Sequence, residues 1–167
     1  MFLLDKSCKL FCRALQFLGD YKYDFHAILR KFKDSIQEEI NFANEVENGV
    51  RTGENFKDND SIKIPHYYRQ HCTKRLITME FVDGVNISRN RVIEKEMNLN
   101  LRDVSGLLIE AYSQMLFCSG FIHCDAHPGN ILVRKNPKDP QKPQLIILDH
   151  GFYRKLDGQF RNRFVQL

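Results

Sequence analysis

One stretch of the chain constrains its fold and chemistry more than any other. It reads GFIHCDAHPGNILVRK over residues 120–135 and is followed by LIILDHGF over residues 145–152. Asn130 comes five residues after Asp125, and Asp149 directly follows an apolar run. Two carboxylates and an amide in such a pattern are typical of a site that binds a hard metal ion and moves a proton.

Two short apolar runs flank these polar residues and predict strands. Residues 131–133 and 145–148 are separated by a turn rich in proline and lysine, so we expect them to pair antiparallel. That pairing returns Asn130 and Asp149 to the same end of the strands. Phosphoryl transfer to a hydroxyl needs charge neutralisation, oxygen ligands for Mg²⁺ and a proton acceptor. We therefore predict that Asp125 acts on the nucleophile while Asn130 and Asp149 hold Mg²⁺.

The histidines of this stretch leave alternatives open. His123 belongs to the predicted catalytic loop, where we expect it to organise the loop through packing and hydrogen bonds. No role is assigned to His127 or His150. A metal-dependent hydrolase would instead use His123, Asp125 and His127 as ligands on one face of a strand. Pro128 interrupts that strand, which counts against the hydrolase.

The apolar residues change their period along the chain. Helical spacing predicts a helix that begins at a capping box of Ser35 and Glu38 and weakens at Gly49 and Gly53. Three further elements follow, which are a β-hairpin over residues 62–81, a short helix within 90–100, and a long helix over 101–119 that Gly120 closes.

Composition excludes several classes of protein. Hydrophobic residues at 43% and charged residues at 28% are typical of a globular domain and not of a disordered or coiled-coil chain. The 25 basic and 21 acidic residues are scattered, which gives no footprint for nucleic acid. The five cysteines are irregularly spaced, so we expect no disulfide framework. The first 19 residues hold one arginine and one serine, which is no convincing transit peptide.

Four motifs in order resemble the UbiB or aarF-domain kinase family, whose fold is an atypical protein-kinase-like one. They are a signature EINFANEVEN at 39–48, a hinge RLITMEFVDG at 75–84, the catalytic loop at 120–135 and a metal-binding segment LIILDHGFY at 145–153. The sequence Asp149-His150-Gly151 resembles the branch of this family that is linked to mitochondrial organisation and lipid homeostasis.

The resemblance implies a role for each matching residue. Asp125 would be the catalytic base, Glu45 would pair with the ATP-binding lysine, and the adenine hinge would comprise Met79, Glu80 and Phe81. In the family, Glu39 and an aspartate two residues later engage a regulatory lysine of a KxGQ motif. Asn41 replaces that aspartate here, which removes one negative charge from the regulatory site.

The expected fold is α+β, an incomplete protein-kinase-like fold. Residues 1–34 would form a helical extension of the small lobe, and residues 35–84 part of the N-lobe with the glutamate helix, β-hairpin and hinge. Residues 85–167 would form part of a mainly helical C-lobe. Neither a KxGQ segment nor a V-A-x-K strand precedes Glu45 in this sequence, so we expect a fragment of a longer chain that is inactive alone.

The function implied by the resemblance is that of an atypical kinase or ATPase that depends on ATP and Mg²⁺ in mitochondrial lipid or ubiquinone homeostasis. Its partners would be a nucleotide and a lipid or quinone precursor. Membrane association would come from parts of the full protein outside these residues. Two alternatives are a small-molecule phosphotransferase of the aminoglycoside or choline kinase type and a non-catalytic pseudokinase.

Overall fold

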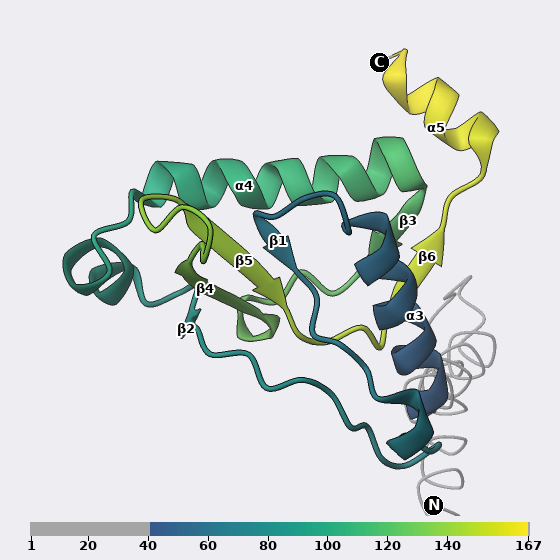
Figure 1. Ribbon diagram of the computed structural model, residues 1–167. Coiled ribbons are helices and arrows are strands. Elements are labelled where there is room, and N and C mark those ends of the chain that lie inside the picture. The colour runs from purple at the N-terminus through teal and green to yellow at the C-terminus, as the bar shows by residue number, and fades with distance from the viewer. Residues whose placement is uncertain (1–40, 167) are drawn as a thin grey trace, which may run out of the picture. The chain divides into compact units, whose positions relative to one another are not determined.

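The computed structural model describes residues 41–166 (Figure 1). The predicted extension at 1–34, the capping box at Ser35 and the regulatory Glu39 lie outside the described residues. In chain order the elements are α3 (Phe42–Asn55), β1 (Ile62–Lys63), η1 (Arg69–His71), β2 (Val85–Asn86), η2 (Val92–Glu96), α4 (Leu101–Ser113), η3 (Gln114–Ser119), β3 (Phe121–His123), η4 (Pro128–Asn130), β4 (Ile131–Lys135), β5 (Pro143–Ile147), β6 (Tyr153–Lys155) and α5 (Gly158–Val165).

A four-stranded sheet in the order β1-β5-β4-β2 forms the centre of the described chain. β4 and β5 pair antiparallel with Ile131 opposite Ile147, which confirms the strand pair predicted from the two apolar runs. β1 adds to β5 in parallel, and every residue of β5 is buried. A second sheet of two strands joins β3 to β6 and sets His123 opposite Tyr153.

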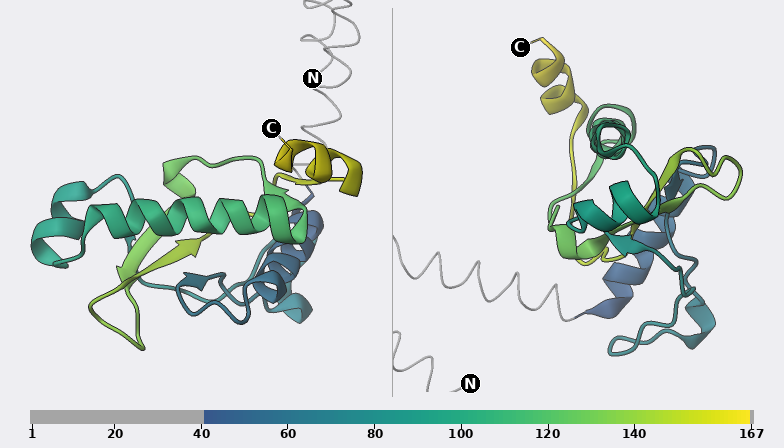
Figure 2. Two further views of the ribbon diagram at one scale, coloured as in Figure 1. Left: turned by 90° about the horizontal axis from the view of Figure 1, so that it is seen from above. Right: turned by 90° about the vertical axis from the view of Figure 1, so that its left-hand side faces the viewer.

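The long helix follows the sequence prediction closely. α4 begins after Asn100, whose side chain accepts the backbone N–H of Arg102, and continues through the π-helical turn η3. Gly120 ends it with φ of 60°, the left-handed conformation that favours glycine. α4 lies along one face of the sheet in both views of Figure 2 and in Figure 1. The glycine cap therefore fixes the position at which the predicted catalytic loop begins.

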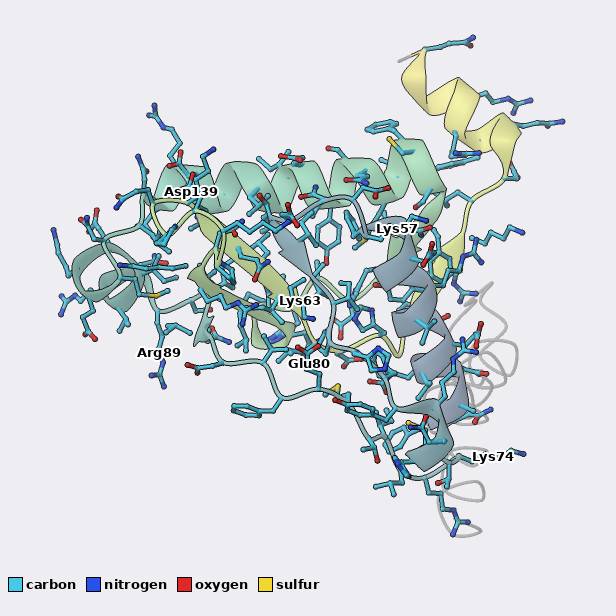
Figure 3. The ribbon with its side chains drawn as sticks, in the orientation of Figure 1. Lys57, Lys63, Lys74, Glu80, Arg89 and Asp139 are labelled. Atoms are coloured by element: carbon cyan, nitrogen blue, oxygen red, sulfur yellow. The ribbon has the colours of Figure 1, made fainter. Side chains whose placement is uncertain are left out.

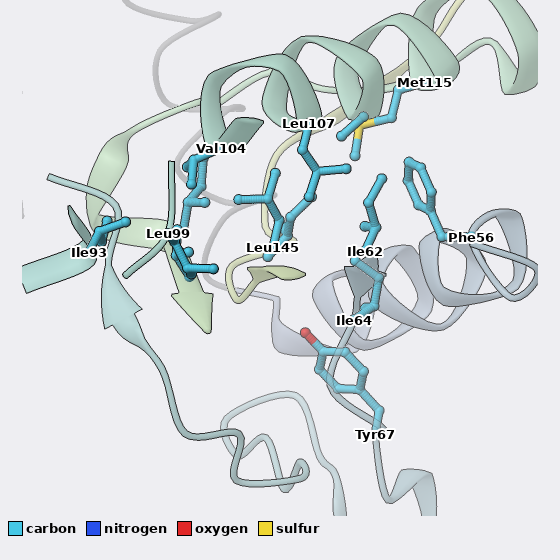
Figure 4. Close-up of a cluster of buried hydrophobic side chains, with 14 of the residues drawn as sticks. Phe56, Ile62, Ile64, Tyr67, Ile93, Leu99, Val104, Leu107, Met115 and Leu145 are labelled. Carbon is cyan, nitrogen blue, oxygen red and sulfur yellow. The ribbon is translucent and has the colours of Figure 1, made fainter. Parts of the chain in front are cut away.

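The core lies between this helix and the sheet. Figure 4 shows side chains of α4, of β1 and of β5 meeting there. The labelled buried members include Val104, Leu107, Met115, Ile62 and Leu145. Burial of each such side chain contributes about 1.5–3 kcal/mol to folding. This core supports the strands that carry the candidate site.

The predicted hairpin over residues 62–81 forms in a reduced version. Its arms meet at two isolated bridges, Tyr67 with Met79 and Thr73 with Leu76. β1 does not join this pairing, because it pairs with β5 instead. Pro65 follows β1 and has no N–H to donate, which is a physical reason why the ladder does not continue there.

α3 continues through both glycines that were expected to weaken its end. Gly49 lies inside the helix, and a Cβ at this position would collide with the ring of the buried Tyr67. A Cβ on Gly53 would meet Ile64 at 3.7 Å, an ordinary contact. Gly49 is therefore a packing position rather than a helix stop, because only glycine lets Tyr67 come this close to the helix.

Among the described helices, none has the length and apolar character that crossing a bilayer requires.

Candidate catalytic and metal-binding site

Asn130 and Asp149 meet at one end of the β4–β5 pair. The N–H of Leu148 donates to the carbonyl of Asn130 at 2.9 Å, which continues the ladder to the edge of the site. Nδ2 of Asn130 then lies 3.5 Å from Oδ2 of Asp149. The antiparallel pairing thus brings together the two residues that the sequence predicts as metal ligands.

Asp149 is held by its own turn. Its Oδ1 accepts the backbone N–H of Gly151 at 2.8 Å, and its carbonyl oxygen accepts a hydrogen bond from Nε2 of His123 at 2.7 Å. A Cβ on Gly151 would lie 3.2 Å from Oδ1 of Asp149, tighter than an ordinary contact. The small residue after His150 therefore leaves room for the carboxylate.

His123 connects the two aspartates. Its Nδ1 accepts the backbone N–H of Asp125 at 3.0 Å, so the ring proton resides on Nε2 and is donated to Asp149. Burial lowers the pKa of His123, with opposing contributions from Asp149 and Asp125, and this favours the neutral ring. The ring occupies the organising position expected from the sequence, while the side chain of Asp125 is exposed.

The same contacts count against the metal-dependent hydrolase. Both ring nitrogens of His123 are engaged, and Nδ1 of His127 accepts the N–H of Gly129 at 3.0 Å. Within residues 41–166, no group of three or more His, Cys, Asp or Glu side chains is arranged to hold a metal ion. A zinc site built from His123, Asp125 and His127 does not fit this arrangement.

One carboxylate and one amide do fit Mg²⁺. Mg²⁺ binds through one or two protein oxygens and completes its shell with water and phosphate oxygens. Asp149 supplies a carboxylate, and rotation of the Asn130 side-chain amide exchanges its nitrogen and oxygen at the same place. The pair therefore has the donor chemistry of a magnesium site that a nucleotide would complete.

α3 faces the segment after Asp149 with two side chains. The carboxylate of Glu45 accepts the backbone N–H of His150, and Nδ2 of Asn48 donates to the carbonyl of His150 at 3.0 Å. Burial raises the pKa of Glu45, the negative charge of Asp149 raises it further, and the His150 hydrogen bond opposes both. Two carboxylates this close favour a cation between them.

His150 is completely buried and fully bonded. Its Nδ1 accepts from the hydroxyl of Tyr153 at 2.8 Å, and its Nε2 donates to the carbonyl of Ile147 at 3.1 Å. The ring stacks on Tyr153 and meets the edge of Tyr67. Burial lowers its pKa to about 4. His150, which the sequence left without a role, is a neutral core residue beneath Asp149.

The predicted hinge residues differ in their exposure and contacts. Met79 is 40% exposed and Phe81 is 91% exposed. Glu80 forms an ion pair of 2.7 Å with Lys63, as Figure 3 shows, and accepts the N–H of His66. These contacts fix the backbone at Glu80, and the side chains on either side of it are left open to solvent.

Asn41, the described member of the predicted regulatory pair, acts locally as a helix cap. Its Oδ1 accepts the N–H of Ala43 at 3.3 Å at the start of α3. Asparagine and aspartate both suit this position, so the exchange of charge does not disturb the helix start.

A cavity of about 330 Å³ opens beside this end of α3, lined by Ala43, Val46, Glu47, Arg69, Cys72, Thr73 and Lys74.

Comparison with known proteins decides the family. The model of the ABC1 atypical kinase-like domain matches residues 4–167. The chain belongs to the ABC1 atypical kinase-like family. The probable serine/threonine-protein kinase abkB of Dictyostelium discoideum is 38% identical over 145 residues, which cover 87% of this chain and 21% of the relative. AarF domain-containing protein kinase 1 of Mus musculus is 35% identical over 145 residues, 87% of this chain and 27% of the relative.

A solved structure shows the same fold. The Mycobacterium tuberculosis protein Rv3197, in a structure titled as its complex with erythromycin, superposes with a TM-score of 0.69 at 19% identity. The match covers 92% of this chain and 36% of Rv3197. The chain thus spans only about a fifth to a third of the proteins it resembles. The kinase-like fold and the resemblance to aarF-domain kinases are confirmed.

Sequence reasoning missed three residues that build the site. Asn48, Tyr67 and Tyr153 surround His150, yet none stood out as functional. Asn48 is the last residue of the signature at 39–48, and this was the one signal that could have drawn attention to it. Tyr67 and Tyr153 gave no such signal, because an aromatic residue beside a strand is typical of an ordinary core.

Proposed function

We propose that this chain is the catalytic part of an atypical kinase or ATPase that uses Mg²⁺ and ATP. The observation that carries the proposal is the convergence of Asn130 and Asp149 at 3.5 Å, with His123 bonded to both aspartate-bearing segments. A phosphoryl-transfer site needs these groups and little covalent chemistry from the protein. Membership of the ABC1 atypical kinase-like family supports the reaction class.

Each residue then has a distinct task. The exposed carboxylate of Asp125 orients the acceptor hydroxyl, or a water molecule, and takes its proton. Asn130 and Asp149 would hold Mg²⁺, which would neutralise charge on the phosphates. Burial and then the charge of Asp149 raise the pKa of Glu45, and a lysine for the nucleotide phosphates would be favoured beside these two carboxylates. His123 links the backbone of Asp125 to that of Asp149 through the hydrogen bonds of its two ring nitrogens.

The adenine and regulatory roles rest on the family resemblance. We propose that Met79, Glu80 and Phe81 lie along the adenine ring, and that Glu39 with Asn41 forms the regulatory contact. A mitochondrial location and a lipid or quinone precursor as acceptor are part of the same proposal. Small molecules should also be tested as acceptors of the phosphoryl group, because the Rv3197 structure is a complex with erythromycin.

The experiment compares two aspartate variants in the full-length protein. Asp149→Ala should abolish the thermal shift that Mg²⁺ and ATP produce, because it removes a carboxylate that would hold Mg²⁺ at the nucleotide. Asp125→Asn should keep the shift and lower turnover by about 10²–10⁴-fold, the usual contribution of a general base. Asp103→Ala, an exposed position on α4, is the control.

Two results would contradict the proposal. A full thermal shift in Asp149→Ala would remove Asp149 from the metal site, and full turnover in Asp125→Asn would remove Asp125 from the chemistry. A wild-type protein that binds Mg²⁺ and ATP but turns over neither ATP nor any acceptor would favour the pseudokinase. One tightly held Zn²⁺ per chain, lost in His127→Ala, would favour the hydrolase instead.

A further inference from the structure

One face of α3 is directed at the segment that carries Asp149. Glu45, Asn48 and Thr52 stand three and four residues apart, so they form a single stripe along the helix. Glu45 and Asn48 reach the peptide groups of His150, and the hydroxyl of Thr52 donates to the carbonyl of Asn48 at 2.8 Å. The helix therefore contacts this segment at successive points.

The contacts on His150 hold it against α3 and the core. Its N–H and C=O are bonded to α3, and its two ring nitrogens are bonded to Tyr153 and Ile147. The residue before it is Asp149, whose carbonyl is bonded to His123. These bonds fix the peptides that follow Asp149, and the N–H of Gly151 then holds its carboxylate.

We propose that Asn48 is a positioning residue, which orients the metal-binding carboxylate of Asp149 by tying the His150 carbonyl to α3. This inference rests on the proposed function of Asp149 as a ligand of Mg²⁺. The amide matters chemically because the partner is a carbonyl, which needs a donor. An aspartate of the same shape would place a third carboxylate beside Glu45 and Asp149 and would have no N–H to donate.

The first measurement needs neither metal nor nucleotide. In the metal-free, full-length protein, Asn48→Asp should speed amide hydrogen exchange at His150 and Gly151 by about ten-fold or more, since the partly buried carbonyl of His150 loses its donor. Asn44→Asp is the matched control, because it makes the same change on the same helix at an exposed position. Unchanged exchange in Asn48→Asp would overturn the inference.

The second measurement is a Mg²⁺ titration at fixed ATP, read as a thermal shift. Asn48→Asp should raise the Mg²⁺ concentration at half-maximal shift by about ten-fold, and saturating Mg²⁺ should restore the full shift. A residue that merely stabilises the fold would lower the melting temperature without this dependence on Mg²⁺. Asn48→Ser, which adds no charge, should move the midpoint in the same direction and serves where Asn48→Asp does not fold.

The outcomes separate the two proposals. Faster exchange with an unchanged Mg²⁺ midpoint, in a protein whose wild type does respond to Mg²⁺ and ATP, would overturn the positioning role and leave the proposed function intact. A wild type without any response would overturn the proposed function and the positioning role together. An equal shift of the midpoint in Asn44→Asp would reduce the effect to charge alone and would also overturn the inference.

Discussion

The catalytic segment at 121–153 and the hinge segment at 75–84 are held in place by different means. In the catalytic segment, the rings of His123 and His150 each use both nitrogens in hydrogen bonds, and strands β4 and β5 flank the site. In the hinge segment, Phe81 is 91% exposed, and the charged side chain between the two exposed hydrophobic residues pairs with Lys63.

A sequence motif predicts geometry where the surrounding chain fixes the residues of the motif. Asn130 and Asp149 come together through contacts that the described chain itself supplies, so the spacing of the motif was enough to anticipate their meeting. In the hinge, the side chains of Met79 and Phe81 are exposed, and their role depends on the resemblance alone. Substitutions in and around the catalytic segment should therefore cost more stability than those in the hinge.

The largest effect should come from acid. The pKa of His150 is lowered to about 4 by burial, against 6.5 for the ordinary side chain, so the unfolded chain binds a proton that the folded chain does not. The part of the folding free energy that depends on a neutral His150 is fully present well above pH 6.5. It is lost as the pH falls toward 4, by up to roughly 3 kcal/mol. His123 adds to this loss, because burial lowers its pKa as well. Urea unfolding at a series of pH values measures it.

His150→Phe tests the origin of this acid sensitivity. Phenylalanine fills the buried aromatic site without a proton to gain, so the fall in stability below pH 6.5 should become shallower, leaving the share of His123. At neutral pH the variant should lose about 1–3 kcal/mol, since Tyr153 and the Ile147 carbonyl lose their partner. An unchanged pH profile would mean that His150 titrates normally in the folded chain.

The next effect concerns how closely α3 approaches the site. Gly49→Ala should destabilise the protein by about 1–3 kcal/mol, because the new methyl group would meet the ring of Tyr67, which packs on His150. Gly53→Ala has room at 3.7 Å and should stabilise by about 0.5–1 kcal/mol through helix propensity. Thermal unfolding measures the change in melting temperature of both variants. A Gly49→Ala variant as stable as the wild type would contradict the close packing of Tyr67 on Gly49.

The sequence predicted the elements whose signals are local. The helix over 101–119 has a helical apolar period and a glycine at its end, and the β4–β5 pair has two apolar runs around a turn. Asn48 could not be assigned in this way, because its partner His150 lies 102 residues further along the chain.

The predicted hairpin forms only in part, for the same physical reason. β1 had the composition to pair with the neighbouring arm, yet β5 offered it a buried strand in parallel. Burial of Ile62 against the core outweighed the shorter loop closure of the hairpin. Tertiary competition of this kind leaves no trace in the local pattern.

The smallest effect should come from the ion pair of the hinge. Burial alone would raise the pKa of Glu80, but Lys63 and the N–H of His66 together lower it. The ionised carboxylate therefore contributes stability above the ordinary pKa of about 4.5, and this is lost as the pH falls below that value. Glu80→Gln should cost less than about 1 kcal/mol, since the pair is partly exposed and screened by salt. Unfolding at low and high salt measures the effect, which should shrink as salt rises; a larger, salt-independent loss would show the hinge to be held as firmly as the catalytic segment.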